Sequence, residues 1–161
     1  MDPPTADQGG TKNSSGVAPE TYRSKRTSHW DAIARQEIRG RGLGGYYHKR
    51  LEQIYQFLVP SGQRVLELGC SGGHLSAALK PEYGMGINFS PDMIQKASRQ
   101  YPHLHFFQAD MHNLVLDERF DAIILSDLVN DLWDVQTVFE QIVRWATPHT
   151  RIILNMYSRL W

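Results

Sequence analysis

Residues 64–75, RVLELGCSGGHL, place an acid and several small residues where a strand would pass into a helix. Glu67 lies near the end of an apolar run, and Gly69, Ser71 and Gly73 follow it at alternate positions. Small side chains let backbone N–H groups and a helix N-terminus come close to a ligand. In open α/β sheets, ligands bind outside the carboxyl ends of the strands, where the strand order reverses. The stretch therefore indicates a site for a nucleotide-like molecule, although a tight strand–helix connection alone would use similar residues.

Strands and helices that alternate along the chain predict the frame that positions this stretch. The spacing of apolar residues between 47 and 58 predicts a helix. Further runs predict strands at 64–68, 84–88, 104–108, 120–126 and 151–157, and helices at 73–80, 91–100 and 134–146. Ser90 and Pro91 are typical of a helix N-terminus. The alternation predicts an α/β fold, a Rossmann-like open, mostly parallel sheet with helices on both faces.

Composition excludes several classes of protein. The 161 residues suffice for one domain, and 17 basic residues balance 17 acidic ones, so no charge excess favours a nucleic acid or a membrane as partner. The single Cys70 cannot form an internal disulfide, which suits a cytoplasmic location. Residues 1–27 are rich in Pro, Gly, Ser and Thr and predict a disordered tail before a domain at 28–161.

The segments VLELGCSGG, GINFSPDMIQKA, FFQAD and FDAIILSDLVNDL resemble, in order and spacing, the class I S-adenosylmethionine-dependent methyltransferases over residues 45–161. The resemblance implies that S-adenosylmethionine is the cofactor and methyl donor. The flanking GGYYHKRLEQIYQFL and TRIILNMYSRLW look similar to methyltransferase regions fused to glycosyltransferases in bacteria, which implies a small-molecule or saccharide acceptor. A non-catalytic or partner-dependent module that binds S-adenosylmethionine is the alternative. An NAD site is disfavoured, because GCSGGH departs from G-x-G-x-x-G.

The same resemblance implies which residues hold the cofactor. The methionine part would lie over the glycine turn, with Glu67 near its amino group, and Asn88 would contact the ribose. Asp110 would bind the adenine amino group. The full set of implied cofactor contacts is Tyr47, Glu67, Gly69, Ser71, Gly73, Asn88, Phe89, Met93, Asp110, Met111 and Ser126.

Two of these positions depart from the family pattern. The family usually has glycine where this chain has Ser71, and an acid where it has Asn88. The Ser71 Cβ crowds a turn that must approach the ligand, and Asn88 loses a charge-assisted hydrogen bond to a ribose hydroxyl. Together the two departures are expected to weaken the affinity for S-adenosylmethionine by about 1–3 kcal/mol.

Methyl transfer from a sulfonium requires little of the protein beyond positioning of the acceptor and exclusion of water. A general base is needed when the nucleophile arrives protonated. Asp131 and His48 are the predicted catalytic residues, and Asp127 is a further candidate. Alternatively, Asp131 caps the following helix and His48 is a solvated helix residue. No metal site is predicted.

The implied sheet is incomplete. The family's sheet has seven strands, and this sequence ends just after the fifth, so the last two strands are missing. In the family's strand order the fifth strand, at 151–157, becomes an apolar edge. Association with a second copy or another chain through this edge is therefore expected.

Overall fold

Five parallel strands form one sheet in the order β3-β2-β1-β4-β5. A computed structural model describes residues 17–35 and 43–156. The strands are β1 (Arg64–Leu68), β2 (Tyr83–Asn88), β3 (His105–Gln108), β4 (Ala122–Ser126) and β5 (Arg151–Asn155). The chain builds the sheet outward from β1 to β3 and then returns to add β4 beside β1. The order therefore reverses between β1 and β4, and the predicted Rossmann-like sheet is confirmed.

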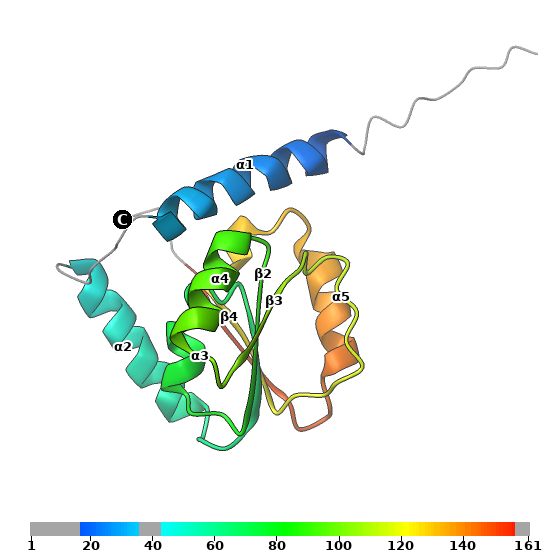
Figure 1. The fold of residues 1–161 in the computed structure, drawn as a ribbon. Helices are drawn as coiled ribbons and strands as arrows, with labels where there is room; N and C mark the ends of the chain where they lie inside the picture. Colours follow the sequence, from blue (N-terminus) through cyan, green and yellow to red (C-terminus); the bar gives the residue numbers. More distant parts are fainter. Residues whose placement is uncertain (1–16, 36–42, 157–161) are drawn as a thin grey trace, which may run out of the picture.

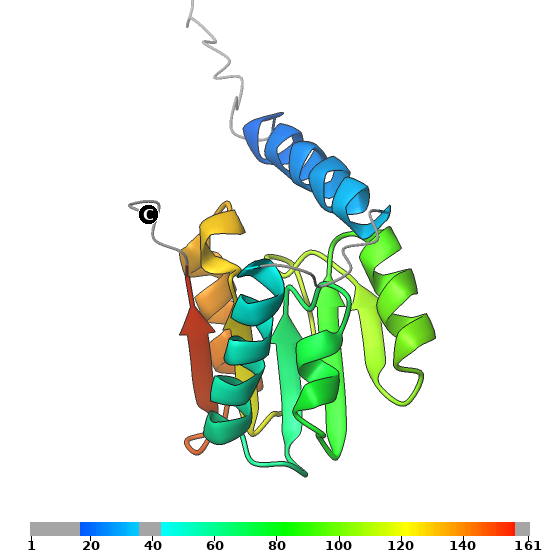
Figure 2. The ribbon, with the colours of Figure 1, turned by 90° about the vertical axis from the view of Figure 1, so that its left-hand side faces the viewer.

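The helices lie on both faces of this sheet. They are α1 (Val17–Arg35), α2 (Leu43–Leu58), α3 (His74–Ala78), α4 (Pro91–Gln100), the 3-10 turn η1 (Val129–Asp131) and α5 (Val135–Trp145). Figures 1 and 2 show α2, α3 and α4 on one face and α5 on the other, with α1 beyond the carboxyl ends of the strands. Ser90 caps α4 as predicted, because its hydroxyl accepts a hydrogen bond from the Met93 N–H at 3.2 Å.

The prediction of a disordered tail over residues 1–27 is wrong for residues 17–27, which belong to α1. Contacts with the folded body hold this helix. Tyr22 packs against Trp133, with ring centroids 5.4 Å apart. Arg26 pairs with Asp131, and the Ser90 hydroxyl donates to Asp31. Residues 1–16 lie outside the described residues. The composition of the segment gave no sign of a helix because tertiary contacts, rather than an apolar stripe, order it.

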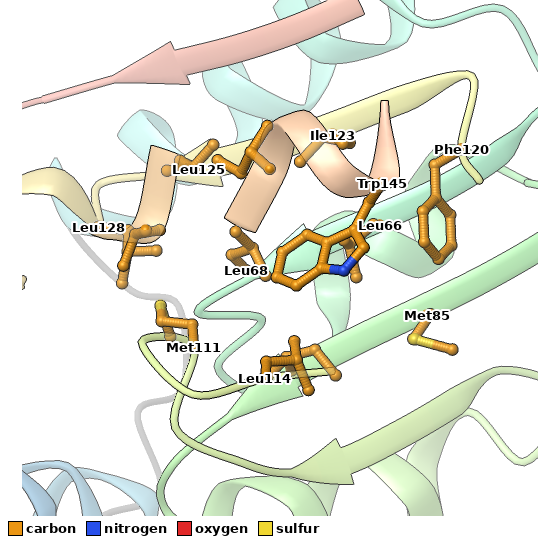
Figure 3. Packing of buried hydrophobic residues seen from close by; sticks show 13 residues of the cluster. Leu66, Leu68, Met85, Met111, Leu114, Phe120, Ile123, Leu125, Leu128 and Trp145 are labelled. Carbon is orange, nitrogen blue, oxygen red and sulfur yellow. The ribbon is translucent and has the colours of Figure 1, made fainter. Parts of the chain in front are cut away.

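The larger part of the core lies between the sheet and α5 (Figure 3). Trp145 of α5 lies among Leu66 and Leu68 of β1 and Ile123 and Leu125 of β4, all fully buried. Successive strand residues point to opposite faces. The alternate residues therefore pack beneath α2 and α3, in a second cluster of Tyr55, Val59, Val65, Leu79, Ala122 and Ile124. Because both faces of β1 and β4 are covered, the carboxyl ends of these two strands are fixed in position.

The fifth strand is an edge of the sheet in the described part of the chain. Ile152 and Leu154 stay 43 % and 44 % exposed, whereas Ile153 on the opposite face packs against the second cluster. The predicted position of this strand as an apolar edge is confirmed. Within residues 17–35 and 43–156, no helix is long and apolar enough to cross a membrane.

Candidate active site

The turn between β1 and α3 has an unusual backbone. Gly69, Ser71 and Gly73 all have left-handed φ angles, of 75°, 47° and 77°. Glycine adopts this conformation at little cost, whereas an L-residue such as Ser71 is strained in it. Strained backbone of this kind gathers at functional sites. The helix that follows, α3, is shorter than the predicted 73–80, and the turn before it is built from small residues.

The two terminal glycines of the turn are also required for packing. A Cβ built on Gly73 would lie 2.6 Å from Phe106 Cζ of β3. A Cβ built on Gly69 would lie 2.8 Å from Leu128 Cδ1. Heavy atoms cannot approach so closely, so both positions exclude larger residues. The Leu128 contact also shows that the turn after β1 touches the segment after β4.

Glu67 is a buried carboxyl group near the end of β1. It is 3 % exposed and accepts a hydrogen bond from the Ser76 hydroxyl of α3. Burial raises the pKa of Glu67 to about 7, although its hydrogen bonds with Ser76 act in the opposite direction. A carboxyl group in this state is half-ionised near neutral pH. A cationic group beside it would favour the ionised form.

Asn88, Met93 and Met111 of the predicted cofactor contacts are buried. Asn88 Oδ1 accepts the Ser90 N–H at 2.9 Å, so the side chain shapes the turn after β2. Met93 lies beneath the turn after β1, with its Sδ 3.8 Å from the Ser71 hydroxyl. Met111 belongs to the core beneath α5. Their roles as cofactor contacts stay predictions.

A cavity of about 190 Å³ opens beside the ends of β2 and β3 and brings together two predicted residues, Phe89 and Asp110. Helix α1 supplies one wall and the start of α5 another. The other lining residues are Tyr22, Arg26, His112, Asp131, Trp133, Asp134 and Thr137. Aromatic rings and carboxylates around one cavity suit a flat heteroaromatic ring that carries hydrogen-bond donors.

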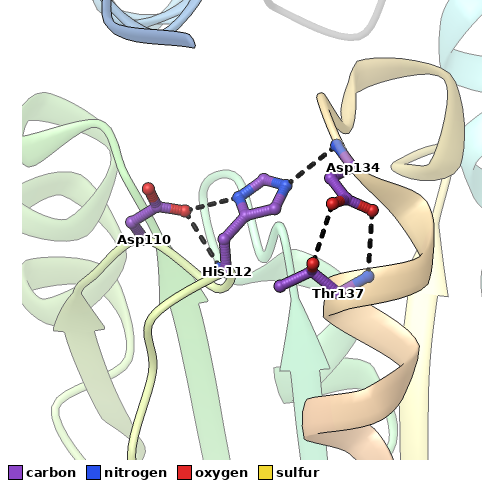
Figure 4. A network of polar contacts seen from close by, with 4 residues as sticks. All are labelled: Asp110, His112, Asp134 and Thr137. Carbon is purple, nitrogen blue, oxygen red and sulfur yellow. Dashed lines mark hydrogen bonds and ion pairs between the residues drawn. The ribbon is translucent and has the colours of Figure 1, made fainter. Parts of the chain in front are cut away.

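A chain of hydrogen bonds fixes one wall of this cavity (Figure 4). The Asp134 N–H donates to His112 Nε2 at 3.3 Å, so this nitrogen is the acceptor. His112 Nδ1 then carries the proton and donates to Asp110 Oδ1 at 2.7 Å. Asp134 in turn caps α5 by accepting the Thr137 N–H at 3.0 Å. The wall therefore links the loop after β3 to the start of α5.

A second polar group lies at the ends of β4 and β5. The Tyr47 hydroxyl of α2 donates to the Asp127 carboxylate, at 2.9 Å from Oδ1 and 3.2 Å from Oδ2. Asn155 Nδ2 donates to the same carboxylate and, at 3.2 Å, to the Tyr47 hydroxyl oxygen. The Tyr55 hydroxyl donates to Asn155 Oδ1 at 2.7 Å. Burial raises the pKa of Tyr55 to about 12, although a hydrogen bond with Ser126 opposes the rise.

The two predicted catalytic residues occupy different surroundings. Asp131 lies in η1 and pairs with Arg26 of α1. The alternative that Asp131 caps the following helix is wrong, because η1 shifts the cap to Asp134. His48 is exposed on α2, with its ring 5.6 Å from that of Tyr47. Neither side chain belongs to the group around Asp127, and their catalytic roles stay predictions.

Sequence reasoning missed Tyr22, His112 and Asn155. Tyr22 fell within the expected tail, and Asn155 is 108 residues from its partner Tyr47. A signal for His112 was present, because it follows Asp110 at the end of a strand and His is a versatile hydrogen-bond partner.

Comparison with known proteins identifies the family. The profile of the methyltransferase domain matches residues 65–149, just over half of the chain. The ubiquinone biosynthesis O-methyltransferase of Coxiella burnetii is 27 % identical over 117 residues, which cover 68 % of this chain and 50 % of that protein. The chain belongs to the class I S-adenosylmethionine-dependent methyltransferases, whose cofactor is S-adenosylmethionine. It spans about half the length of this curated relative.

Solved structures support the same fold. The N-methyltransferase NodS of Bradyrhizobium japonicum, in complex with S-adenosylhomocysteine, superposes with a TM-score of 0.69 at 16 % identity, over 80 % of this chain and 71 % of that chain. The glycopeptide N-methyltransferase MtfA, complexed with sinefungin, gives 0.58 at 18 % identity, over 65 % of this chain and 51 % of that chain. Both show that the five-stranded sheet is the methyltransferase sheet.

The residues of the site fit S-adenosylmethionine chemically. The cavity that contains Phe89 and Asp110 offers a ring for stacking and a carboxylate for the adenine amino group. The turn from Gly69 to Gly73 carries only small side chains after the end of β1. Glu67 is a buried carboxyl group near the same strand end, and its contact with the cofactor's ammonium group stays a prediction. Neither Glu67 nor the turn lines the cavity that contains Phe89 and Asp110.

Proposed function

We propose that this chain transfers the methyl group of S-adenosylmethionine to a small-molecule or glycan-linked acceptor. One observation carries the proposal. A turn of small residues after β1 touches, through Leu128 and Gly69, the segment that holds the hydrogen-bonded Asp127 after β4. The predicted position of the cofactor's methionine part and a polar group for an acceptor therefore adjoin where the strand order reverses.

Within this site each residue has a distinct task. Glu67 pairs with the cofactor's ammonium group, and the turn from Gly69 to Gly73 admits its methionine part. Asn88 meets the ribose, while Phe89 and Asp110 enclose the adenine. S-adenosylmethionine itself supplies the activated methyl group, so the protein's task is to align the acceptor and exclude water. Helix α1 contributes Tyr22 and Arg26 to the enclosure of the cavity.

The acceptor class is inferred from the relatives and neighbours. The curated relative is an O-methyltransferase in ubiquinone biosynthesis, and one structural neighbour is a glycopeptide N-methyltransferase. An oxygen or nitrogen acceptor, free or attached to a glycan, is consistent with both. Asp131 and His48 remain our candidates for contact with the distal part of such an acceptor. The cytoplasmic location inferred from the single cysteine stays a prediction.

The test is to incubate the purified chain with S-adenosylmethionine and, in turn, catechol, benzylamine and methyl glucoside. Mass spectrometry then measures S-adenosylhomocysteine and the methylated product. We expect equal amounts of the two products with at least one probe. Uncoupled loss of S-adenosylmethionine, or none at all from a folded chain that binds it, would contradict methyl transfer.

A second function, binding of S-adenosylmethionine without transfer, is favoured by Ser71 and Asn88. The backbone of Ser71 is strained at φ 47°. The side-chain oxygen of Asn88, Oδ1, already accepts a hydrogen bond from the Ser90 N–H. Binding in calorimetry with no product from any probe would select this alternative.

We infer that the edge strand β5 is covered by another polypeptide segment in the working protein. Ile152 and Leu154 expose apolar side chains on a strand that forms the edge of the sheet in the described part of the chain. Light scattering at rising concentration is expected to show association of the isolated chain, which the double variant Ile152→Lys, Leu154→Lys should reduce. A monodisperse wild-type chain at high concentration would contradict this inference.

A further inference from the structure

The Asp127 carboxylate is held by side chains from two other elements. Tyr47 reaches it from α2, and Asn155 reaches it from the end of β5, where the register pairs Asn155 with Ser126 of β4. Tyr47 is 80 residues from Asp127 in the chain, and Asn155 is 28 residues from it. The three side chains meet only because α2, β4 and β5 converge at the carboxyl end of the sheet.

The partners of Asp127 are arranged as donors around one acceptor. Asn155 cannot turn its amide around without losing a bond, because its Oδ1 accepts the hydroxyl proton of buried Tyr55 at 2.7 Å. This bond fixes Asn155 Nδ2 toward Asp127 and Tyr47. A carboxylate has about four acceptor positions, so it can receive a further donor beside these two.

The backbone at Asp127 is strained in the same way as the backbone at Ser71, in the turn between β1 and α3. Its φ of 53° is left-handed, a conformation that an L-residue occupies at a cost. Its neighbour Leu128 packs against Gly69, so this strained residue adjoins the turn that admits the cofactor. Asp127 therefore follows β4 at the point where β4 lies beside β1.

We propose that Asp127 is the catalytic proton acceptor for the methyl acceptor, and that Tyr47 and Asn155 are positioning residues. This inference rests on the proposed methyl transfer. The acceptor is a nucleophile that carries a proton, a hydroxyl or an amino group, and it donates a hydrogen bond to Asp127. Asp131 and His48 do not fit this role, because Asp131 pairs with Arg26 and His48 is exposed on α2.

The step balances without any further reactant. A lone pair on the acceptor's oxygen or nitrogen forms the new bond to the methyl carbon. The carbon–sulfur bond breaks, and its electron pair stays on sulfur as the thioether of S-adenosylhomocysteine. The acceptor's proton passes to the Asp127 carboxylate and from there to solvent. A carbon nucleophile without a transferable proton would gain nothing from this residue.

The experiment compares Asp127→Asn, Tyr47→Phe and Asn155→Ala with the wild type and with the control Tyr46→Phe. Tyr46 precedes Tyr47 on α2 and is 72 % exposed. Circular dichroism and calorimetric titration with S-adenosylmethionine first establish the fold and the cofactor affinity of each variant. Single-turnover methyl transfer to catechol, benzylamine and methyl glucoside is then measured between pH 5 and 9.

We expect Asp127→Asn to lower the single-turnover rate at least about 100-fold, the usual contribution of a general base. Its affinity for S-adenosylmethionine should stay within about twofold of wild type. Tyr47→Phe and Asn155→Ala should lower the rate about tenfold, with a shifted pH profile, because each removes one donor to the carboxylate. Tyr46→Phe should match the wild type.

Two results would overturn the proposal. The first is an Asp127→Asn variant that transfers methyl groups at the wild-type rate. The second is an Asp127→Asn variant that no longer binds S-adenosylmethionine, which would make Asp127 a cofactor contact. A wild-type chain that fails to bind S-adenosylmethionine, or that binds it and methylates no probe, would instead count against the proposed function.

Discussion

The carboxyl ends of β1 and β4 lie side by side in the sheet but carry opposite kinds of residue. After β1 come Gly69, Ser71 and Gly73, which have little or no side chain. After β4 comes Asp127, which large polar side chains from α2 and β5 surround. Both segments contain left-handed backbone, and both rest on the same buried core.

One edge of the sheet can therefore serve two ligands by different means. The β1 side carries small residues and one buried acid, Glu67, so we infer that its specificity comes from shape and from that acid. The β4 side is built from side chains held by hydrogen bonds, so its specificity comes from polar groups. We assign the β1 side to the cofactor and the β4 side to the acceptor. The experiments below change one side at a time.

Gly73→Ala should have the largest effect on the β1 side. The substitution puts an L-residue at φ 77° and a methyl group 2.6 Å from Phe106 Cζ. Left-handed strain and overpacking together should lower the free energy of unfolding by about 4 kcal/mol. Urea denaturation of the variant and the wild type measures the change.

Gly62→Ala is the matched control for this substitution. Gly62 has nearly the same φ of 78°, but a Cβ there would meet nothing within 4 Å. Only the backbone strain remains, so the loss should be about 1–2 kcal/mol. Equal losses in the two variants would show that the contact between the turn and Phe106 is unimportant.

Glu67→Gln should change how stability depends on pH. Burial raises the pKa of Glu67 from 4.5 in the unfolded chain to about 7 in the folded one. Between these two values the folded protein holds a proton that the unfolded chain has released. Stability therefore falls as pH rises through this window, by about 3 kcal/mol at most.

Urea denaturation at pH 4.5 and pH 8 measures this fall in the wild type and in Glu67→Gln. The variant lacks the titrating group, so its free energy of unfolding should change less between the two pH values. Contributions from other titrating groups are the same in both proteins and cancel when the two changes are compared. S-adenosylmethionine should restore part of the wild type's loss at pH 8, because its ammonium group favours the ionised carboxylate. The same pH dependence in both proteins would count against the raised pKa.

Tyr55→Phe tests the β4 side without touching the carboxylate directly. It removes the hydroxyl that donates to Asn155 at 2.7 Å and leaves the buried ring in place. Loss of one buried hydrogen bond should cost about 1–2 kcal/mol. Tyr46→Phe, at an exposed position, should leave the free energy of unfolding unchanged in the same thermal unfolding experiment. An equal loss of stability in both variants would argue against the hydrogen-bond network of Tyr55, Asn155 and Asp127.

Ser71→Gly should have the smallest effect and the opposite sign. Glycine relieves the left-handed strain at φ 47° but gains entropy in the unfolded chain, so the net stabilisation should be about 0.5–1 kcal/mol. Removal of the Cβ also opens the turn, so S-adenosylmethionine should bind more tightly by calorimetry. A weaker affinity would mean that the Ser71 side chain contributes to binding.

The sequence was sufficient to predict the sheet because its strands are apolar at consecutive positions and its turns are marked by glycine and proline. Strand 64–68 was predicted with its observed bounds, since Glu67 near its end and the glycine that follows it mark where the apolar run stops. Helix α1 was not predicted, because it depends on contacts such as Arg26 with Asp131 rather than on an apolar stripe.

The predicted cofactor side of the site has a local sequence signal that the proposed acceptor side lacks. Small residues after β1 are adjacent in the sequence, so their pattern can be read directly. The partners of Asp127 are distant in the sequence, and nothing local in Tyr47 or Asn155 reveals that they meet. The alternative that Asp131 caps α5 placed the cap three residues too early, because η1 is not visible in the apolar pattern.

The most direct test of the account is a calorimetric titration of the folded wild-type chain with S-adenosylmethionine and with S-adenosylhomocysteine. We expect one site per chain for both ligands, with micromolar affinity. We also expect Gly62→Ala to bind like the wild type and Gly73→Ala to bind much more weakly. A wild-type chain that is folded by circular dichroism but binds neither ligand would contradict the account.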